Sequence, residues 1–235
     1  MKTNKVTSIV LSIALLFACF ISPATSIKSC AKGLSLYNDN NQVDFAALQA
    51  YNPDIYAWIY TPNTKVNYPI VQSTQNDYYL MKNVDGSNGY PGAIYTNKEN
   101  TKTFQDFNTV IYGHNMKNKS AFGSLHNFDS QSFFEQNQDM LIYTAEGIYS
   151  YQIYSTVKYS NALILYSFPS SSEISRQSFV NMSLTGYAGS SVEHVRNGVS
   201  VTTEDKLVTL STCISDSNYR FLVIAKQTGF TEYGY

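Results

Sequence analysis

The sequence predicts a mainly β domain with a few small helices added, in which about eight strands form a closed or nearly closed barrel. Val, Ile, Tyr, Phe and Thr dominate the apolar segments, and these residue types favour strands. Turn residues separate the segments at short intervals, and strands do not alternate regularly with helices. A chain of 235 residues allows one such domain plus a short extra segment.

That extra segment is the N-terminus, residues 1–32. Lys2 and Lys5 precede an almost uncharged apolar run over 6–21, which is the pattern of an export signal. The run is near the lower length limit for a membrane-spanning helix, so we expect a single N-terminal membrane anchor or, alternatively, a cleaved signal. A lipoprotein signal is only faintly matched. In each case residues 33–235 form an extracytoplasmic domain.

The first half of this domain is expected to hold one helix and four short strands. Apolar residues at helical spacing over 43–51 predict the helix, with Asp44 in its first turn and Asn52-Pro53 ending it. The remaining expected elements are strands at 55–60 and 66–71 joined as a hairpin, a helical turn at 77–82, a Gly- and Asn-rich loop at 85–92, and strands at 93–96 and 109–112.

The second half is expected to hold the longer strands. Glu146-Gly147 marks a hairpin turn between two strands. The expected elements are one or two short helices in 120–137, strands at 140–143 and 148–159, a helix at 174–182 capped by a residue of 170–172, a second possible helix at 191–196, and strands at 206–212 and 221–225.

Composition excludes several classes of function. The formal net charge is −1 and no basic block is present, so nucleic acid is not expected as a partner. No Cys-x-x-Cys or His-rich spacing suggests a metal site. Of the three cysteines, Cys19 and Cys30 lie in or beside the N-terminal segment. Cys213 is therefore alone in the domain, which favours a free thiol over a disulfide framework.

Cys213 ends one predicted strand, and Arg220 begins the next after a loop of six residues. A tight connection would bring the thiol and the guanidinium within reach of each other. A thiol beside a fixed cation ionises more readily, and the thiolate is the form that attacks a carbonyl carbon. The alternative is a buried core thiol and an unrelated surface charge.

His114 supplies the third group. It follows the strand at 109–112 and Gly113, so its imidazole would also project from a strand end. An imidazole can return a proton to a leaving amine and take one from an incoming nucleophile, and a cation can steady an oxyanion. Taken alone, a histidine here is more often structural than catalytic. His126 and His194 are assigned to structural roles.

These residues carry a resemblance to a known family. Residues 209–213, Thr-Leu-Ser-Thr-Cys, followed by Arg220, resemble the cysteine signature of sortases. Residues 112–116, Tyr-Gly-His-Asn-Met, resemble the histidine segment of the same enzymes. The similarity covers about residues 43–226, and the segments that resemble class B sortases in particular are 67–72, 76–80 and 114–134.

The resemblance implies the eight-stranded sortase barrel with N-terminal helices and a helix before the cysteine strand. It also implies a cysteine transpeptidase of Gram-positive bacteria that anchors surface proteins to the cell wall. Cys213 would cleave a C-terminal sorting signal of the Asn-Pro-x-Thr type, or a relative, after Thr, forming a thioester. An amine of peptidoglycan or its precursor would resolve the thioester, with His114 as acid and base and Arg220 holding the substrate or the oxyanion.

By the same resemblance, Asn76, Leu80 and Ser211 match substrate-binding positions, and no metal or organic cofactor is implied. One departure is Ile214, which stands where some class B members have an acidic residue. Three alternatives remain open: a cysteine peptidase of the same fold with water as acceptor, a pilin-polymerising sortase, and a non-enzymatic wall-binding module. Strand alternation adds that Ser211 and Cys213 share a face that becomes polar toward its end.

Overall fold

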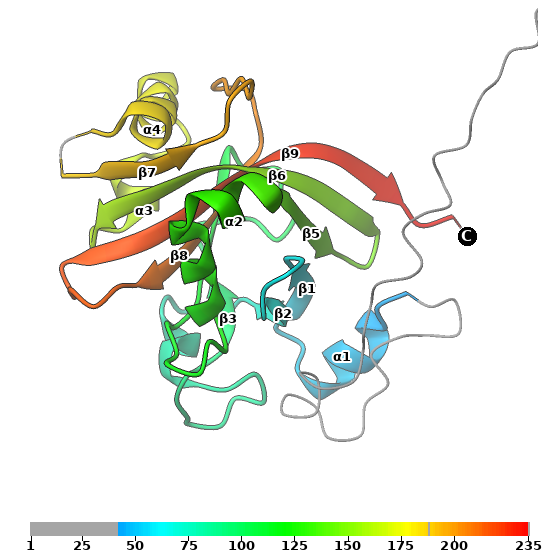
Figure 1. Cartoon of the computed structure of the whole chain (residues 1–235). Helices are drawn as coiled ribbons and strands as arrows, with labels where there is room; N and C mark the ends of the chain where they lie inside the picture. Colours follow the sequence, from blue (N-terminus) through cyan, green and yellow to red (C-terminus); the bar gives the residue numbers. More distant parts are fainter. Residues whose placement is uncertain (1–41, 188, 235) are drawn as a thin grey trace, which may run out of the picture. The chain divides into compact units, whose positions relative to one another are not determined.

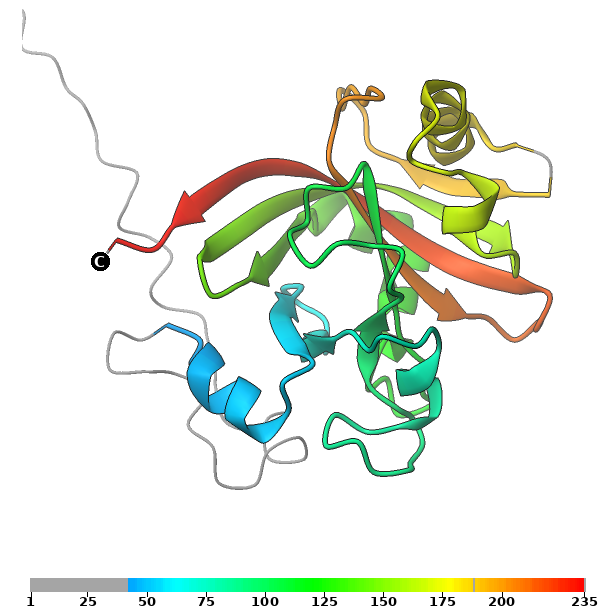
Figure 2. The same cartoon turned by 180° about the vertical axis from the view of Figure 1, so that it is seen from behind.

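Eight strands of the domain close into a barrel, as the sequence predicts. The structure is a computed structural model that describes residues 42–187 and 189–234, so the predicted anchor and the boundary at residue 32 lie outside it. Around the ring the strand order is β5-β1-β2-β3-β4-β8-β9-β6, and the pairing of β5 with β6 closes it. A ninth strand, β7, is added at the outer edge of β6 (Figures 1 and 2).

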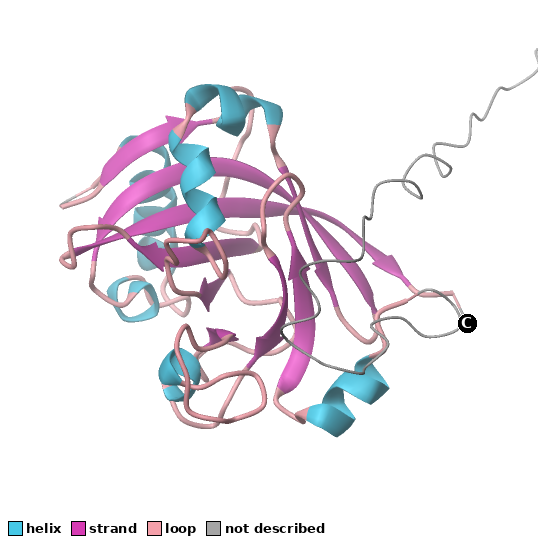
Figure 3. Cartoon of the chain, turned by 60° about the horizontal axis from the view of Figure 1, so that its bottom comes forward, coloured by secondary structure: helices cyan, strands magenta, loops and turns pink. Residues whose placement is uncertain are grey.

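Strands hold more of the described residues than helices do, and most of the helices are short (Figure 3). The first part of the chain forms α1 (Phe45–Tyr51), β1 (Ile55–Tyr60), β2 (Asn67–Val71), η2 (Tyr78–Met81), β3 (Ile94–Thr96), β4 (Asn108–Tyr112), η3 (Gly123–Asp129) and α2 (Gln131–Gln136). The second part forms β5 (Asp139–Tyr143), β6 (Gly147–Ser160), α3 (Ile164–Ser167), α4 (Glu173–Thr185), β7 (Ser191–Val195), β8 (Leu207–Cys213) and β9 (Tyr219–Glu232).

Two pairings in the ring are parallel, β2 with β3 and β4 with β8, and the others are antiparallel. The β4–β8 pair joins segments about a hundred residues apart, with Tyr112 opposite Ser211. Parallel neighbours cannot be joined by a tight turn, so the chain between them is free to form helices and the other strands. This pairing brings the end of β4 beside the end of β8.

Alternation along β8 divides the apolar residues between two cores. Val208 and Leu210 point into the barrel, where they pack with residues of β9, η3 and α2. Leu207 points outward into a second cluster, the outer core, which contains Phe179 of α4 and Leu222 of β9. Since both faces of β8 are covered along most of its length, its register is fixed, and a slip by one residue would turn Cys213 to the other face.

Most predicted elements are confirmed. The helix at 43–51 begins two residues later than expected, because Asp44 is its N-cap and its carboxylate accepts a hydrogen bond from Ala47 N (2.9 Å). The segment 120–137 forms two short helices, η3 and α2. The helix at 174–182 is α4, with Ser172 as its cap. Within the described residues, no helix has the length and apolar character needed to cross a membrane.

The helix considered for 191–196 is wrong, because this segment is the strand β7. It pairs antiparallel with β6, with Ser155 opposite Val195 and Val157 opposite Val192. Its valines are β-branched, and Val192 packs against the outer core while Ser191 and Glu193 are exposed. Sheet pairing therefore decides the conformation of a segment whose polar residues also allow a helix.

One strand is longer than the sequence predicts, and one helix is additional. The strand expected at 221–225 is the much longer β9, whose last part pairs with the start of β6, for example Phe230 with Tyr149. The short helix α3 was not predicted; it follows β6 and places Ile164 in the outer core. The start of α3 borders the candidate site described below, as do Arg220 and Leu222 near the start of β9.

Candidate active site

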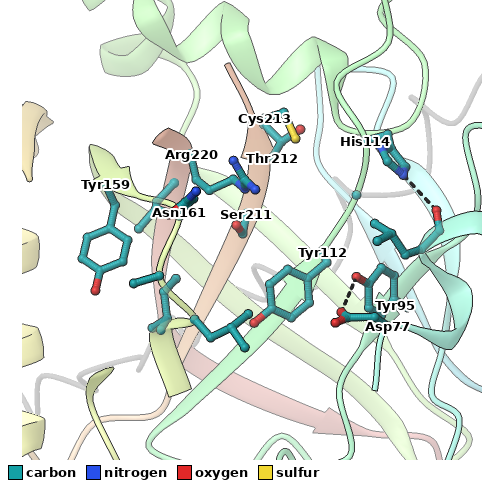
Figure 4. Close-up of a pocket in the computed structure, with 16 residues that line it drawn as sticks. Asp77, Tyr95, Tyr112, His114, Tyr159, Asn161, Ser211, Thr212, Cys213 and Arg220 are labelled. Atoms are coloured by element: carbon teal, nitrogen blue, oxygen red, sulfur yellow. Dashed lines mark hydrogen bonds between the residues drawn. The ribbon is translucent and has the colours of Figure 1, made fainter. Parts of the chain in front are cut away.

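Cys213 is the last residue of β8, and Arg220 lies opposite it on β9. The thiol is free and half-buried. The guanidinium of Arg220 donates through Nη1 to the carbonyl oxygens of Ser217 (3.0 Å) and Tyr219 (2.8 Å), which holds it over the β8–β9 turn. Figure 4 shows the guanidinium directed toward the end of β8. The tight turn between β8 and β9 therefore places Cys213 and Arg220 opposite each other, as the sequence predicts.

His114 lies two residues beyond β4, beside the end of β8. Gly113 N donates to the Ser211 carbonyl (3.2 Å), which continues the parallel ladder up to His114. The ring packs against Tyr90, with centroids 4.9 Å apart, and Nε2 donates to the Leu80 carbonyl (2.8 Å; Figure 4). Since a carbonyl only accepts, this contact assigns the hydrogen to Nε2 and leaves Nδ1 as the acceptor in the neutral ring.

His114, Cys213 and Arg220 line one cavity of about 200 Å³ on the outer face of the barrel (Figure 4). Its floor comes from outward-facing residues of three neighbouring strands, Tyr112, Ser211 and Leu222. No hydrogen bond joins the thiol and the imidazole among the residues that the structure describes. They face a common space instead, which is what an enzyme needs if a substrate carbonyl is to enter between the nucleophile and the acid–base group.

Two of the three predicted substrate-binding residues also line this cavity. Leu80, in η2, forms part of one wall with Asp77, and Ser211 forms part of the floor. Asn76 is not in the lining; its amide donates to the Glu99 carboxylate (2.7 Å), and its side-chain oxygen accepts from Lys98 N (3.1 Å). The structure therefore brings Leu80 and Ser211 to the cavity and places Asn76 beyond its edge.

Sequence reasoning missed a tyrosine pair in the cavity wall. Tyr95 and Tyr112 stack at 5.3 Å, and the Tyr95 hydroxyl donates to the Asp77 carboxylate (3.0 Å). Burial raises the pKa of both tyrosines well above the ordinary value, and the charge of Asp77 adds to the effect. Both hydroxyls therefore stay protonated at neutral pH. The alternation of side chains along β4 could have indicated Tyr112, because it places this residue on the outer face of the barrel, opposite to Ile111.

The opposite wall was missed as well. It consists of Tyr159 from β6 and the segment 161–164 that leads into α3. Tyr166 of α3 donates to the same Glu99 oxygen that Asn76 contacts (2.8 Å), so hydrogen bonds connect the two sides beyond the cavity's edge. No pattern in the sequence pointed to these residues, since their position depends on the long-range pairing of β6 with β9.

The other two histidines are built into the framework. His194 on β7 donates through Nε2 to the Asp129 carbonyl (2.9 Å) and packs on Phe134. His126, in the last turn of η3, contacts the Asp129 carboxylate and the backbone of Cys213. Neither lines the cavity. Among the described residues, no group of three or more His, Cys, Asp or Glu side chains is arranged to hold a metal ion.

Comparisons with known proteins agree with this geometry. Residues 59–228 match the family model of the sortase domain. Sortase B of Listeria monocytogenes is 29% identical over 194 residues, covering 80% of this chain and 75% of that protein.

Solved structures give the same result. A Clostridium perfringens sortase B superposes with a TM-score of 0.69 at 26% identity, covering 77% of this chain and 85% of that one. A Bacillus anthracis sortase B superposes with a TM-score of 0.68 at 32% identity, covering 78% and 83%. The chain belongs to the sortase family and is a class B sortase.

Proposed function

We propose that this sortase is a cysteine transpeptidase that cleaves a C-terminal sorting signal after Thr and joins the shortened protein to a cell-wall amine. The observation that carries the proposal is the convergence of His114, Cys213 and Arg220, from the ends of three different strands, on one cavity. We assign the thiol as nucleophile, the imidazole as acid and base, and the guanidinium as the group that holds the oxyanion or the substrate backbone.

In the first half of the reaction, the Cys213 thiolate attacks the carbonyl carbon of the Thr residue in the sorting motif. The tetrahedral oxyanion is stabilised by the fixed charge of Arg220. The C–N bond then breaks, and the departing amine takes a proton from the His114 imidazolium. The products are a thioester on Cys213 and the free C-terminal remnant of the surface protein.

In the second half, an amine of peptidoglycan or its precursor attacks the thioester carbonyl. The amine loses a proton to the neutral His114 ring, the C–S bond breaks, and Cys213 leaves as a thiolate. The enzyme returns to its starting state with one amide broken and one formed. The competing reaction is hydrolysis, in which water replaces the amine and the same thioester is consumed.

We assign the sorting motif to the cavity between η2 and the segment 161–164. Leu80 and Ser211 contribute an apolar side chain and a hydroxyl to its lining, which suits a short peptide of the Asn-Pro-x-Thr type or a relative. We assign Asn76 to the outer edge of this cavity, on the basis of its contact with Glu99. No cofactor takes part in the scheme.

We infer that the domain works outside the cytoplasm, held at the membrane by the segment 1–32 or released by its cleavage. The charge pattern of that segment supports an orientation with Lys2 and Lys5 inside. Protease treatment of intact cells tests this inference. We expect the domain to be digested while a cytoplasmic marker survives; protection of the domain would contradict the orientation.

The proposed reaction is tested by incubating the full chain with a small library of sorting peptides, with and without an amine such as oligoglycine or diaminopimelate. We expect cleavage after Thr and an amide product that appears only when the amine is present. Cys213→Ala should abolish cleavage, whereas Cys30→Ala, which removes a thiol outside the domain, should not. A hydrolysed product unchanged by every amine would support the peptidase alternative, and cleavage by Cys213→Ala would refute the proposal.

A further inference from the structure

His126 contacts Cys213 from outside the cavity. Its Nε2 lies 3.1 Å from the Cys213 carbonyl oxygen, and the Asn115 amide donates to the same oxygen (3.0 Å). The ring stacks on Phe221 of β9, with centroids 4.9 Å apart and planes 23° apart. His126 borders a separate surface depression and shares no lining with the cavity. Any effect of His126 on the thiol therefore acts through the residue that carries it.

The hydrogen-bond pattern around this ring allows two protonation states without movement of the heavy atoms. Nδ1 lies 3.1 Å from the Asp129 carboxylate, which only accepts, so Nδ1 carries a hydrogen. When Nε2 is also protonated, it donates to the Cys213 carbonyl. When Nε2 is bare, it accepts from the Asn115 amide, which lies 3.1 Å away and has a second hydrogen for Cys213.

We propose that His126 is a positioning residue for Cys213: with Asn115 it holds the Cys213 carbonyl and, when protonated, places a positive charge beside the nucleophile. The proposal rests on the nucleophilic role assigned to Cys213 above. In the charged state the carbonyl has two donors, one of them ionic, and ionic hydrogen bonds are the stronger kind. In the neutral state the Cys213 carbonyl keeps one of these two side-chain donors, the Asn115 amide.

The charges around the ring favour the protonated state. The hydrogen bond to Asp129 raises the pKa of His126, burial opposes the rise, and the Cys213 carbonyl adds to it. Lys119, in the loop before η3, lowers the pKa. Phe221, on the strand packed against the ring, is uncharged. A negative charge near the imidazolium gains from the interaction, so the thiolate is the form of Cys213 that a protonated ring favours.

The test measures the thiol directly and needs no sorting peptide. The full chain is treated with iodoacetamide at a series of pH values, and alkylation of Cys213 is followed by mass spectrometry. Trypsin releases Cys213 in the peptide 207–220, because Lys206 precedes it and Arg220 ends it. Cys19 and Cys30 fall in other peptides, so their modification does not interfere.

His126→Phe keeps a ring against Phe221 and removes both nitrogens. We expect the wild type to be alkylated about two- to fivefold faster than this variant at about pH 6. The ratio should fall toward one as the pH rises through the raised pKa of His126, because the ring then becomes neutral. Asp129→Asn should lower the pKa of His126, because a neutral amide no longer favours the charged ring. The enhancement of Cys213 alkylation by His126 should therefore be lost at a lower pH in Asp129→Asn than in the wild type.

His194→Phe is the matched control, since His194 also bonds a backbone carbonyl and packs on a phenylalanine but does not touch Cys213. Its ratio to the wild type should stay near one at every pH. A ratio for His126→Phe that does not change with pH would overturn the proposal. If His126→Phe does not fold, the test uses Asp129→Asn instead, since Asp129 is exposed and its substitution should leave the fold intact. A pH profile of Cys213 alkylation identical to that of the wild type would then overturn the proposal. If the proposed transpeptidase function is wrong, the result differs: the wild type does not cleave sorting peptides, while the pH dependence of Cys213 alkylation stays as described here.

Discussion

Gly113 separates the last residue of β4 from His114, and a methyl group at this position has no room. A Cβ atom there would lie 2.6 Å from Ile94 Cδ1 and 2.7 Å from two ring carbons of Phe122. Phe122 is fully buried and Ile94 nearly so, and neither can turn into solvent. Overpacking of this kind costs about 1–3 kcal/mol, so Gly113→Ala should lower the free energy of unfolding by that amount.

The same clash should reduce activity. Relief of the clash requires the backbone before His114 to shift, and a displacement of about 1 Å in a reacting group can lower the rate about a hundredfold. We expect kcat to fall about tenfold or more with a smaller change in KM, since most of the peptide-binding lining is untouched. Urea unfolding measures the stability, and cleavage of a fluorogenic sorting peptide measures the kinetics.

Gly229→Ala is the control for this substitution. Gly229 lies in β9, and no heavy atom of the described residues lies within 4 Å of an added Cβ. We expect this variant to keep its stability to within about 0.5 kcal/mol and to keep its activity. If Gly113→Ala unfolds at the wild-type urea concentration and cleaves at the wild-type rate, the packing around the end of β4 does not position the imidazole.

Three further predictions concern the framework of the site. Arg196→Ala should destabilise the domain by about 2 kcal/mol in urea unfolding, because the guanidinium donates to four carbonyls, those of Phe134, Glu135, Asn137 and Ile153; an unchanged midpoint would contradict this. Lys119→Gly should stabilise by about 0.5 kcal/mol, since this exposed residue has φ = +64°; destabilisation would show that its side chain is needed. The pKa of His126 is raised in the folded state, chiefly by Asp129, so its contribution is complete below the ordinary pKa and is lost as pH rises through the raised value. The difference in unfolding free energy between wild type and His126→Phe should therefore shrink with rising pH, and a constant difference would show that the ring is not titrating.

The strand ends that carry the candidate residues could be predicted because they depend on local patterns. Apolar runs that stop at Gly113 and at Cys213 mark where strands end, and six residues between Cys213 and Arg220 limit the connection to a turn. The position of His114 beside Cys213 could not be derived in this way. It depends on the parallel pairing of β4 with β8, and only the resemblance to sortases supplied it.

The errors and omissions have a common physical cause. The residues of 191–196 also allow a helix, and only the pairing with β6 decides in favour of the strand β7. The structural role predicted for His126 agrees with its contacts to Asp129 and Phe221, but its neighbours along the chain do not reveal that it also contacts Cys213. Its contact with Cys213 comes from packing η3 against β8, 87 residues further along the chain. Local sequence carries no signal for such contacts, and they need the closed barrel to exist.

The central claim is that the sulfur of Cys213 carries the acyl group between donor and acceptor. The most direct measurement is mass spectrometry of the full chain trapped with a sorting peptide in the absence of an amine, followed by analysis of the tryptic peptide 207–220. We predict that this peptide gains the mass of the motif up to Thr, that hydroxylamine removes the added mass, and that His114→Ala greatly slows its appearance. An acyl group on any other residue, or cleavage of the peptide with no adduct at Cys213 at any time, would contradict the account.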